Sequence, residues 1–139
     1  MKLKIKKLVE EAIIPKFAYE EDAGMDLYSI EDVIINPGER VAIRTGISME
    51  FSKEYVALIW DKSGIATKKG LTKIAGVIDS NYRGEWKIIL FNLGKEIAQI
   101  NCGDKIAQVL FQKVEHPEIE ICEELSDTSR GEGGFGSTG

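Results

Sequence analysis

Apolar side chains alternate with polar or small ones over one long stretch, and this period of two constrains the fold most. From residue 41 to 51, valine, isoleucine, threonine, methionine and phenylalanine fill the odd positions, and alanine, arginine, glycine, serine and glutamate fill the even ones. Successive side chains of a strand point to opposite faces of a sheet, whereas a helix needs a period of 3.6. The stretch therefore predicts one half-buried strand over residues 41–51.

Shorter apolar runs predict further strands. Runs rich in β-branched or aromatic residues cover 55–60, 86–91, 106–114 and 118–121, and turn residues such as Asn36-Pro37-Gly38 separate them. Strands at intervals of about ten residues indicate an all-β sandwich or barrel. We expect one short helix over 63–69 with Ser63 as its N-cap. An apolar strand ending at Asp79 and a second one starting at Trp86 predict a hairpin.

Composition narrows the class of protein. A chain of 139 residues predicts one domain, and 43% apolar residues can form a core without disulfides. Two cysteines, Cys102 and Cys122, are too few for a disulfide framework and favour a reducing cytoplasm. The net charge of −5 argues against a nucleic-acid-binding protein. No apolar run reaches the roughly 20 residues that a membrane span needs, and no signal peptide is evident, so we expect no membrane partner.

The last ten residues differ sharply from the rest. Residues 130–139 include five glycines, which make ordering costly, and only Phe135 could join a core. Gly131, Gly133 and Gly136 form a G-x-G-x-x-G pattern, but a dinucleotide site needs a preceding strand and a following helix, and only three residues follow. We expect a tail that is mobile alone and ordered on a partner or ligand, with Arg130 supplying charge.

Several polar residues follow predicted strands or turns, and each alone has a simple structural explanation. Asp79 suits general base chemistry if it faces a pocket, but it is also an ordinary turn residue. Lys62 and Ser63 combine a cation and a hydroxyl at a predicted helix start, which suits a phosphate. The only histidine, His116, excludes a multi-histidine metal site, and the adjacent Pro117 indicates a loop position for it rather than a catalytic one.

Taken in order, five segments resemble the five motifs of the trimeric deoxyuridine triphosphate nucleotidohydrolases, the dUTPases. They are residues 23–29, 62–66, 76–85, 103–109 and 130–139, and together they extend over nearly the whole chain. The resemblance implies a distorted jelly-roll β-barrel (a β-clip) with one short helix, assembled as a homotrimer that shares its active sites. It implies a body over 1–125 and a flexible arm over 126–139. It also implies hydrolysis of dUTP to dUMP and pyrophosphate with Mg²⁺, which limits uracil in DNA and supplies dUMP for thymidylate synthesis.

The resemblance assigns a role to individual residues. Asp79 resembles the general base that orients a water toward the α-phosphorus, and backbone groups of residues 71–79 resemble those that read uracil and exclude thymine. Tyr82 resembles the residue under the deoxyribose, and Phe135 the ring that stacks on uracil. Mg²⁺ would be held by the triphosphate and waters, with Asp26 holding a metal-bound water or the cation of the second motif. The implied substrate-binding residues are Lys62, Ser63, Gly64, Gly76, Val77, Ile78, Tyr82, Gln108, Arg130, Phe135, Gly136 and Ser137.

Two positions depart from the family pattern, and two other functions compete. Lys62 stands where arginine is usual and cannot form a bidentate fork with Asp26, and Asn81 stands where many members have an acid or glycine. A deoxycytidine triphosphate deaminase shares this fold but has a glutamate where this chain has Arg83, which cannot serve as a protonatable acid. A binding module without catalysis is the other alternative, and the intact Asp79 and tail argue against it.

Overall fold

The computed structural model describes residues 1–134 and 136, and these form eleven strands and one short helix. In chain order the elements are β1 (Lys4–Lys7), β2 (Met25–Tyr28), β3 (Val33–Ile35), β4 (Arg40–Arg44), β5 (Ile47–Glu50), β6 (Tyr55–Trp60), α1 (Ser63–Lys69), β7 (Leu71–Lys73), β8 (Val77–Ile78), β9 (Lys87–Asn92), β10 (Ala98–Ile100) and β11 (Lys105–Lys113). The expectation of an all-β chain with a single short helix is confirmed.

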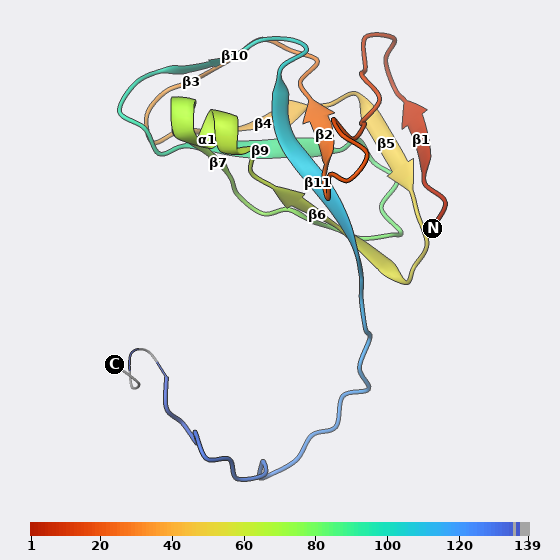
Figure 1. Ribbon diagram of the computed structural model, residues 1–139, viewed down its shortest axis with the longest axis vertical. Coiled ribbons are helices and arrows are strands. Elements are labelled where there is room, and N and C mark those ends of the chain that lie inside the picture. The colour runs from red at the N-terminus through yellow and green to blue at the C-terminus, as the bar shows by residue number, and fades with distance from the viewer. Residues whose placement is uncertain (135, 137–139) are drawn as a thin grey trace.

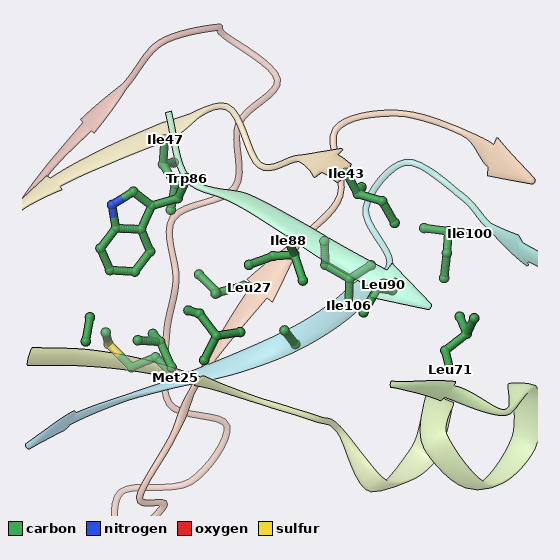
Figure 2. Close-up of a cluster of buried hydrophobic side chains, with 14 of the residues drawn as sticks. Met25, Leu27, Ile43, Ile47, Leu71, Trp86, Ile88, Leu90, Ile100 and Ile106 are labelled. Atoms are coloured by element: carbon green, nitrogen blue, oxygen red, sulfur yellow. The ribbon is translucent and has the colours of Figure 1, made fainter. Parts of the chain in front are cut away.

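The strands form four antiparallel sheets that wrap around one core (Figure 1). The largest has the order β2-β11-β6-β8, the next has the order β4-β9-β7, and β1-β5 and β10-β3 are two-stranded. Leu27, Ile88 and Ile106 are fully buried and meet between the strands (Figure 2). Burying an apolar side chain of this size stabilises the fold by about 1.5–3 kcal/mol.

The predicted strand over residues 41–51 is two strands rather than one. Its core-facing residues are as the alternation predicts, because Ile43, Ile47 and Met49 are buried. The chain turns at Gly46, whose φ is 67°, and passes from the β4-β9-β7 sheet to β5, which pairs with β1. A left-handed φ suits glycine, so this residue lets one alternating sequence serve two sheets.

Three local predictions were wrong. The strand ending before Asp79 does not form a hairpin with the strand after Trp86, because β8 pairs with β6 while β9 pairs with β4 and β7. Residues 118–121 form no strand, because the chain beyond β11 runs away from the sheets and finds no partner there (Figure 1). The N-cap of α1 is Lys62 rather than Ser63, without a side-chain capping bond, and Gly70 ends the helix with a φ of 64°.

Candidate active site

A pocket of about 330 Å³ lies where β2, β11 and the start of α1 meet. We call it the donor pocket; its lining residues are Ala18, Tyr19, Asp22, Ala23, Gly24, Asp26, Lys62, Ser63 and Gln108. Lys62, Ser63 and Gln108 carry ammonium, hydroxyl and amide donors, which are the groups that bind phosphate oxygens. The donor pocket therefore brings together parts of three motif segments that are far apart in sequence.

The carboxylate of Asp26 anchors the cations at the donor pocket. Asp26 is only 3% exposed; its Oδ1 accepts a hydrogen bond from Lys62, and the Lys105 ammonium lies 2.6 Å from its Oδ2. Burial alone raises the pKa of Asp26, but the Lys105 and Lys62 ammonium groups outweigh it and hold that pKa below its ordinary value. The two ammonium groups and the Asp26 carboxylate together carry one net positive charge, which faces the Asp22 carboxylate in the same pocket. Lys62 thus makes the pairing with Asp26 despite lacking the arginine fork.

The Gln108 side chain is oriented by two close neighbours. Its Nε2 donates to the backbone oxygen of Asp61 at 2.8 Å, which uses one of the two amide hydrogens and leaves the second for a ligand. A Cβ added at Gly24 would lie 2.6 Å from Gln108 Oε1, so a larger residue there would displace this amide. Gly24 is therefore required by the packing of Gln108.

A separate and smaller slot lies between the two larger sheets. We call it the slot; its lining residues are Ile59, Lys73, Ile74, Ala75, Gly76, Val77, Ile78, Lys87, Ile88 and Ile89. Its volume of about 130 Å³ is well below the 300 Å³ or more that pockets for drug-sized ligands have, so it suits one small ring. Ala75 has a φ of 63° and Gly76 a φ of 132°, which give the rim of the slot its sharp bend.

Backbone contacts keep the slot narrow. The Ile59 N–H donates to the Gly76 oxygen at 2.8 Å, and a Cβ at Gly76 would lie 3.1 Å from the Ile59 oxygen. That distance is shorter than ordinary van der Waals contact, and the positive φ of Gly76 would add backbone strain for a residue with a Cβ. Gly76 is therefore the residue that lets β8 lie close to β6 at this point.

Asp79 and Tyr82 lie in the turn that follows β8. The Asp79 carboxylate is exposed and borders a hollow shared with Lys53, Tyr55 and His116. The Tyr82 N–H donates to the Asp79 oxygen at 3.1 Å, which closes the turn. Tyr82 as a residue is 46% exposed, and its hydroxyl donates to the Glu85 oxygen at 3.1 Å. Both side chains are accessible to a ligand.

The Asp79 turn and the donor pocket lie at opposite ends of β6. Ile78 pairs with Ala57, whereas Gln108 pairs with Trp60, three residues further along the strand. At about 3.4 Å per residue, those positions are roughly 10 Å apart, and Asp79 and the donor pocket lie beyond them on either side. Among the residues that the structure describes, none lines both the slot and the donor pocket. One chain therefore presents the parts of the site at separate places.

The remaining site residues expected from the sequence lie outside these pockets. Gly64 is exposed on the first turn of α1, and Arg130 is exposed in the tail, where its Nε donates to the Gly133 oxygen at 2.7 Å. Gly136 has a φ of 94° with open space around it. Phe135 and Ser137 lie outside the described residues.

Two residues of the site have no counterpart in the sequence-based predictions. Lys105 reaches Asp26 because β11 pairs with β2, and Asp61 contacts Thr72 and Lys73. Neither contact shows in a single sequence, because both depend on which strands become neighbours. Among the described residues there is no group of three or more His, Cys, Asp or Glu side chains that could hold a metal ion. The helical residues described also include no segment with the length and hydrophobicity to cross a membrane.

Comparisons with known proteins agree on one family. The family model described as dUTPase matches residues 10–139. The chain is 52% identical over 141 residues to a protein named deoxyuridine 5'-triphosphate nucleotidohydrolase from Nautilia profundicola, covering 100% of this chain and 99% of that protein. A variant of the Staphylococcus bacteriophage 80alpha dUTPase, solved with dUpNHpp, has a TM-score of 0.93 at 28% identity, covering 99% of this chain and 98% of that one.

A second solved structure concerns a metal. A variant dUTPase from phage phi11 of S. aureus has a TM-score of 0.85 at 28% identity, covering 91% of this chain and all of that one, and its description refers to the coordination of a structural Mg(II) ion.

Proposed function

The chain belongs to the dUTPase family, and from this premise we propose that it hydrolyses dUTP to dUMP and pyrophosphate. The observation that carries the proposal is that one chain presents both a ring-sized slot and a separate pocket of phosphate-binding donors. A pyrimidine nucleoside triphosphate has these two ends. The bound dUTP analogue in the related phage enzyme supports the same substrate class.

The slot selects the base. Residues 74–76 form part of its lining, and we assign their peptide groups to the polar edge of uracil. Gly76 O is held against β6 by the Ile59 N–H at 2.8 Å, which fixes the width of the slot. The 5-methyl group of thymine would overlap this wall, and one methyl group in a tight site changes selectivity by about 10–200-fold. Gly76, Val77 and Ile78 are the substrate-binding residues here.

Tyr82 selects the sugar. Its exposed ring lies close against Gly84, and its hydroxyl donates to the Glu85 oxygen, so it offers a flat apolar surface in the turn that follows β8. A deoxyribose packs on such a ring, whereas the 2′-hydroxyl of a ribose would meet it without a hydrogen-bond partner. This arrangement discriminates dUTP from UTP.

The donor pocket binds the phosphates. Lys62, Ser63 and Gln108 donate hydrogen bonds to phosphate oxygens, Gly64 lets the start of α1 approach them, and the excess positive charge of the Asp26 cluster offsets theirs. The described residues fit Mg²⁺ held mainly by the triphosphate and water, because Asp26 already engages two ammonium groups. When bound, Mg²⁺ neutralises charge on the phosphates.

Asp79 acts as the general base. Its exposed carboxylate orients a water and accepts its proton as the water oxygen attacks the α-phosphorus. The bond between the α-phosphorus and the oxygen that bridges the α- and β-phosphates breaks, and pyrophosphate leaves with that oxygen. Because Asp79 and the donor pocket lie at opposite ends of β6 in one chain, the site is completed by a second copy. Membership of the dUTPase family implies that the copies form a homotrimer with shared active sites, and the separation of the two half-sites in one chain supports that assignment.

The C-terminal segment supports this assembly. Ile119 and Ile121 are 87% and 96% exposed, on the segment beyond β11 that runs away from the sheets (Figure 1). Such apolar exposure is removed when the segment packs on a neighbouring copy. The arm over 126–139 then brings Arg130 to the phosphates, Phe135 over uracil, and Gly136 and Ser137 against the nucleotide. Closure of the arm shields the site from bulk water and keeps the attacking water inside it.

The surroundings of the enzyme follow from its surface. Cys102 and Cys122 are both free and exposed, which suits a reducing cytoplasm. The net charge of −5 suits a small substrate carried with Mg²⁺ rather than a nucleic acid or membrane partner.

Pyrophosphate release with Mg²⁺ and dUTP, UTP, dTTP or dCTP in parallel tests the proposed reaction. We expect rapid release from dUTP and slow release from the other three. Tight binding of dUTP without turnover would instead identify a binding module, and ammonia release from dCTP would identify a deaminase.

A further inference from the structure

The carboxylate of Asp61 joins two structural elements that no continuous ladder connects. Asp61 follows β6, and its Oδ2 accepts a hydrogen bond from Thr72 Oγ1 at 2.7 Å while its Oδ1 accepts one from the Lys73 N–H at 2.6 Å. Both donors belong to β7, which lies in the β4-β9-β7 sheet, whereas β6 lies in the β2-β11-β6-β8 sheet. Asp61 is thus a hydrogen-bonded connection between the two larger sheets.

This connection lies at one end of the slot. The slot is bordered by the chain from Lys73 to Ile78, which leaves β7 in one sheet and enters β8 in the other. At its far end, the Ile59 N–H fixes Gly76 to β6. At its near end, the Asp61 carboxylate fixes Lys73 to the residue that follows β6. The bent segment between them is therefore held at both ends.

The Lys73 side chain reinforces the same bend. Its ammonium donates to the Ala75 oxygen at 3.1 Å and lies 5.5 Å from the centre of the Trp60 ring. Ala75 has a φ of 63°, which costs a residue with a Cβ about 1–2 kcal/mol and persists only where neighbours hold it. The Asp61 carboxylate positions the backbone from which this side chain extends.

We propose that Asp61 is a positioning residue that sets the width of the slot and so its selectivity among pyrimidines. The inference rests on the proposed function, because it assigns uracil to the slot. The Asp61 carboxylate bonds to β7, whereas the Asp61 backbone oxygen accepts a hydrogen bond from Gln108 in the donor pocket. Removing the side chain therefore loosens the slot and leaves the Gln108 contact in place.

Two variants with a matched control separate these roles. Asp61→Ala removes both side-chain hydrogen bonds, and Asp61→Asn keeps an oxygen for the Lys73 N–H and an amide that can donate to Thr72. Asp32→Asn is the control, because Asp32 also accepts a backbone N–H, that of Cys102, but lies outside both pockets. The readouts are kcat and KM for dUTP and dTTP and the deuterium uptake of residues 71–76.

For Asp61→Ala we expect KM for dUTP to rise and the preference for dUTP over dTTP to fall, each by about tenfold, while kcat changes less than threefold. Asp61→Asn should recover most of this loss, and Asp32→Asn should match the wild type. Faster deuterium uptake at residues 71–76 should accompany Asp61→Ala alone.

Unchanged selectivity and unchanged uptake in Asp61→Ala would overturn the role of Asp61, as would a fall in kcat with KM unmoved. Wild-type turnover of dUTP decides the proposed function separately. If the wild type does not hydrolyse dUTP, the deuterium uptake still decides whether Asp61 holds the β7 end of the slot.

Discussion

Substituting Gly84 by alanine should impair sugar discrimination without unfolding the chain. A Cβ at Gly84 would lie 2.3 Å from the Tyr82 hydroxyl oxygen and 2.5 Å from its Cζ. Ordinary van der Waals contact begins near 3.4 Å, so the ring must retreat by about 1 Å. Because Tyr82 is 46% exposed, its ring can move into solvent, at the cost of its hydrogen bond to Glu85, about 1 kcal/mol.

The expected effect on activity is larger than the effect on stability. In the proposed site the Tyr82 ring excludes the 2′-hydroxyl of a ribose by contact, and a displaced ring would no longer exclude it. The ratio of kcat/KM for dUTP to that for UTP should fall by about tenfold to a hundredfold in Gly84→Ala. Pyrophosphate release with each nucleotide measures this ratio, and urea unfolding measures the change in stability.

Tyr82→Phe is the matched control, because it loses the same hydrogen bond to Glu85 without pushing the ring away from Gly84. We expect its dUTP-to-UTP ratio to stay within about threefold of the wild type. A wild-type ratio in Gly84→Ala, or an equal loss in both variants, would refute the reasoning that ring position sets sugar selectivity.

Three further predictions follow from the site and the core. Asp79→Asn should bind dUTP with near wild-type affinity in an equilibrium titration yet lose at least about a hundredfold in kcat; turnover near that of the wild type would remove Asp79 from the role of base. Gly46→Ala should lower the free energy of unfolding in urea by about 2–5 kcal/mol, because the φ of this residue is 67° and the added Cβ would lie 2.8 Å from Val9 Cγ2. No measurable change would contradict the claim that this turn requires glycine. The pKa of folded Asp26 lies below its unfolded value of 3.8, so its stabilising contribution is present above pH 3.8 and is lost as pH falls through the folded pKa. The free energy of unfolding measured in urea should lose this pH dependence in Asp26→Asn. An identical pH dependence in that variant would contradict the assignment of the ion pairs to Asp26.

The sequence predicts well the features that depend on local pattern. The alternation over residues 41–51 identifies Ile43, Ile47 and Met49 as core residues, and residues 63–69 coincide with α1. The break at Gly46 escapes the pattern, because it arises from the change of partner between β4 and β5. In the same way β8 pairs with β6 rather than with β9, which no local signal reveals.

The site residues likewise divide into those that a local motif identifies and those that strand pairing brings together. The order of the motifs in the sequence identifies Lys62, Ser63 and Gln108 as site residues, and all three line the donor pocket in the structure. The cation that shares Asp26 with Lys62 is Lys105, and the pairing of β11 with β2 brings it there. Contacts between strands far apart in sequence thus supply the electrostatics of the site, and a single sequence does not encode them visibly.

The central claim is that dUTP is hydrolysed at sites that combine Asp79 of one copy with the donor pocket of another. Mixing Asp79→Asn with Gln108→Ala, unfolding the mixture in urea and refolding it tests this claim most directly. Each variant alone should be nearly inactive. A mixture in equal amounts should recover about a quarter of the wild-type rate of pyrophosphate release, because one site in four pairs two intact halves. A refolded mixture no more active than its two components would show that each site is built within one chain, contrary to this account.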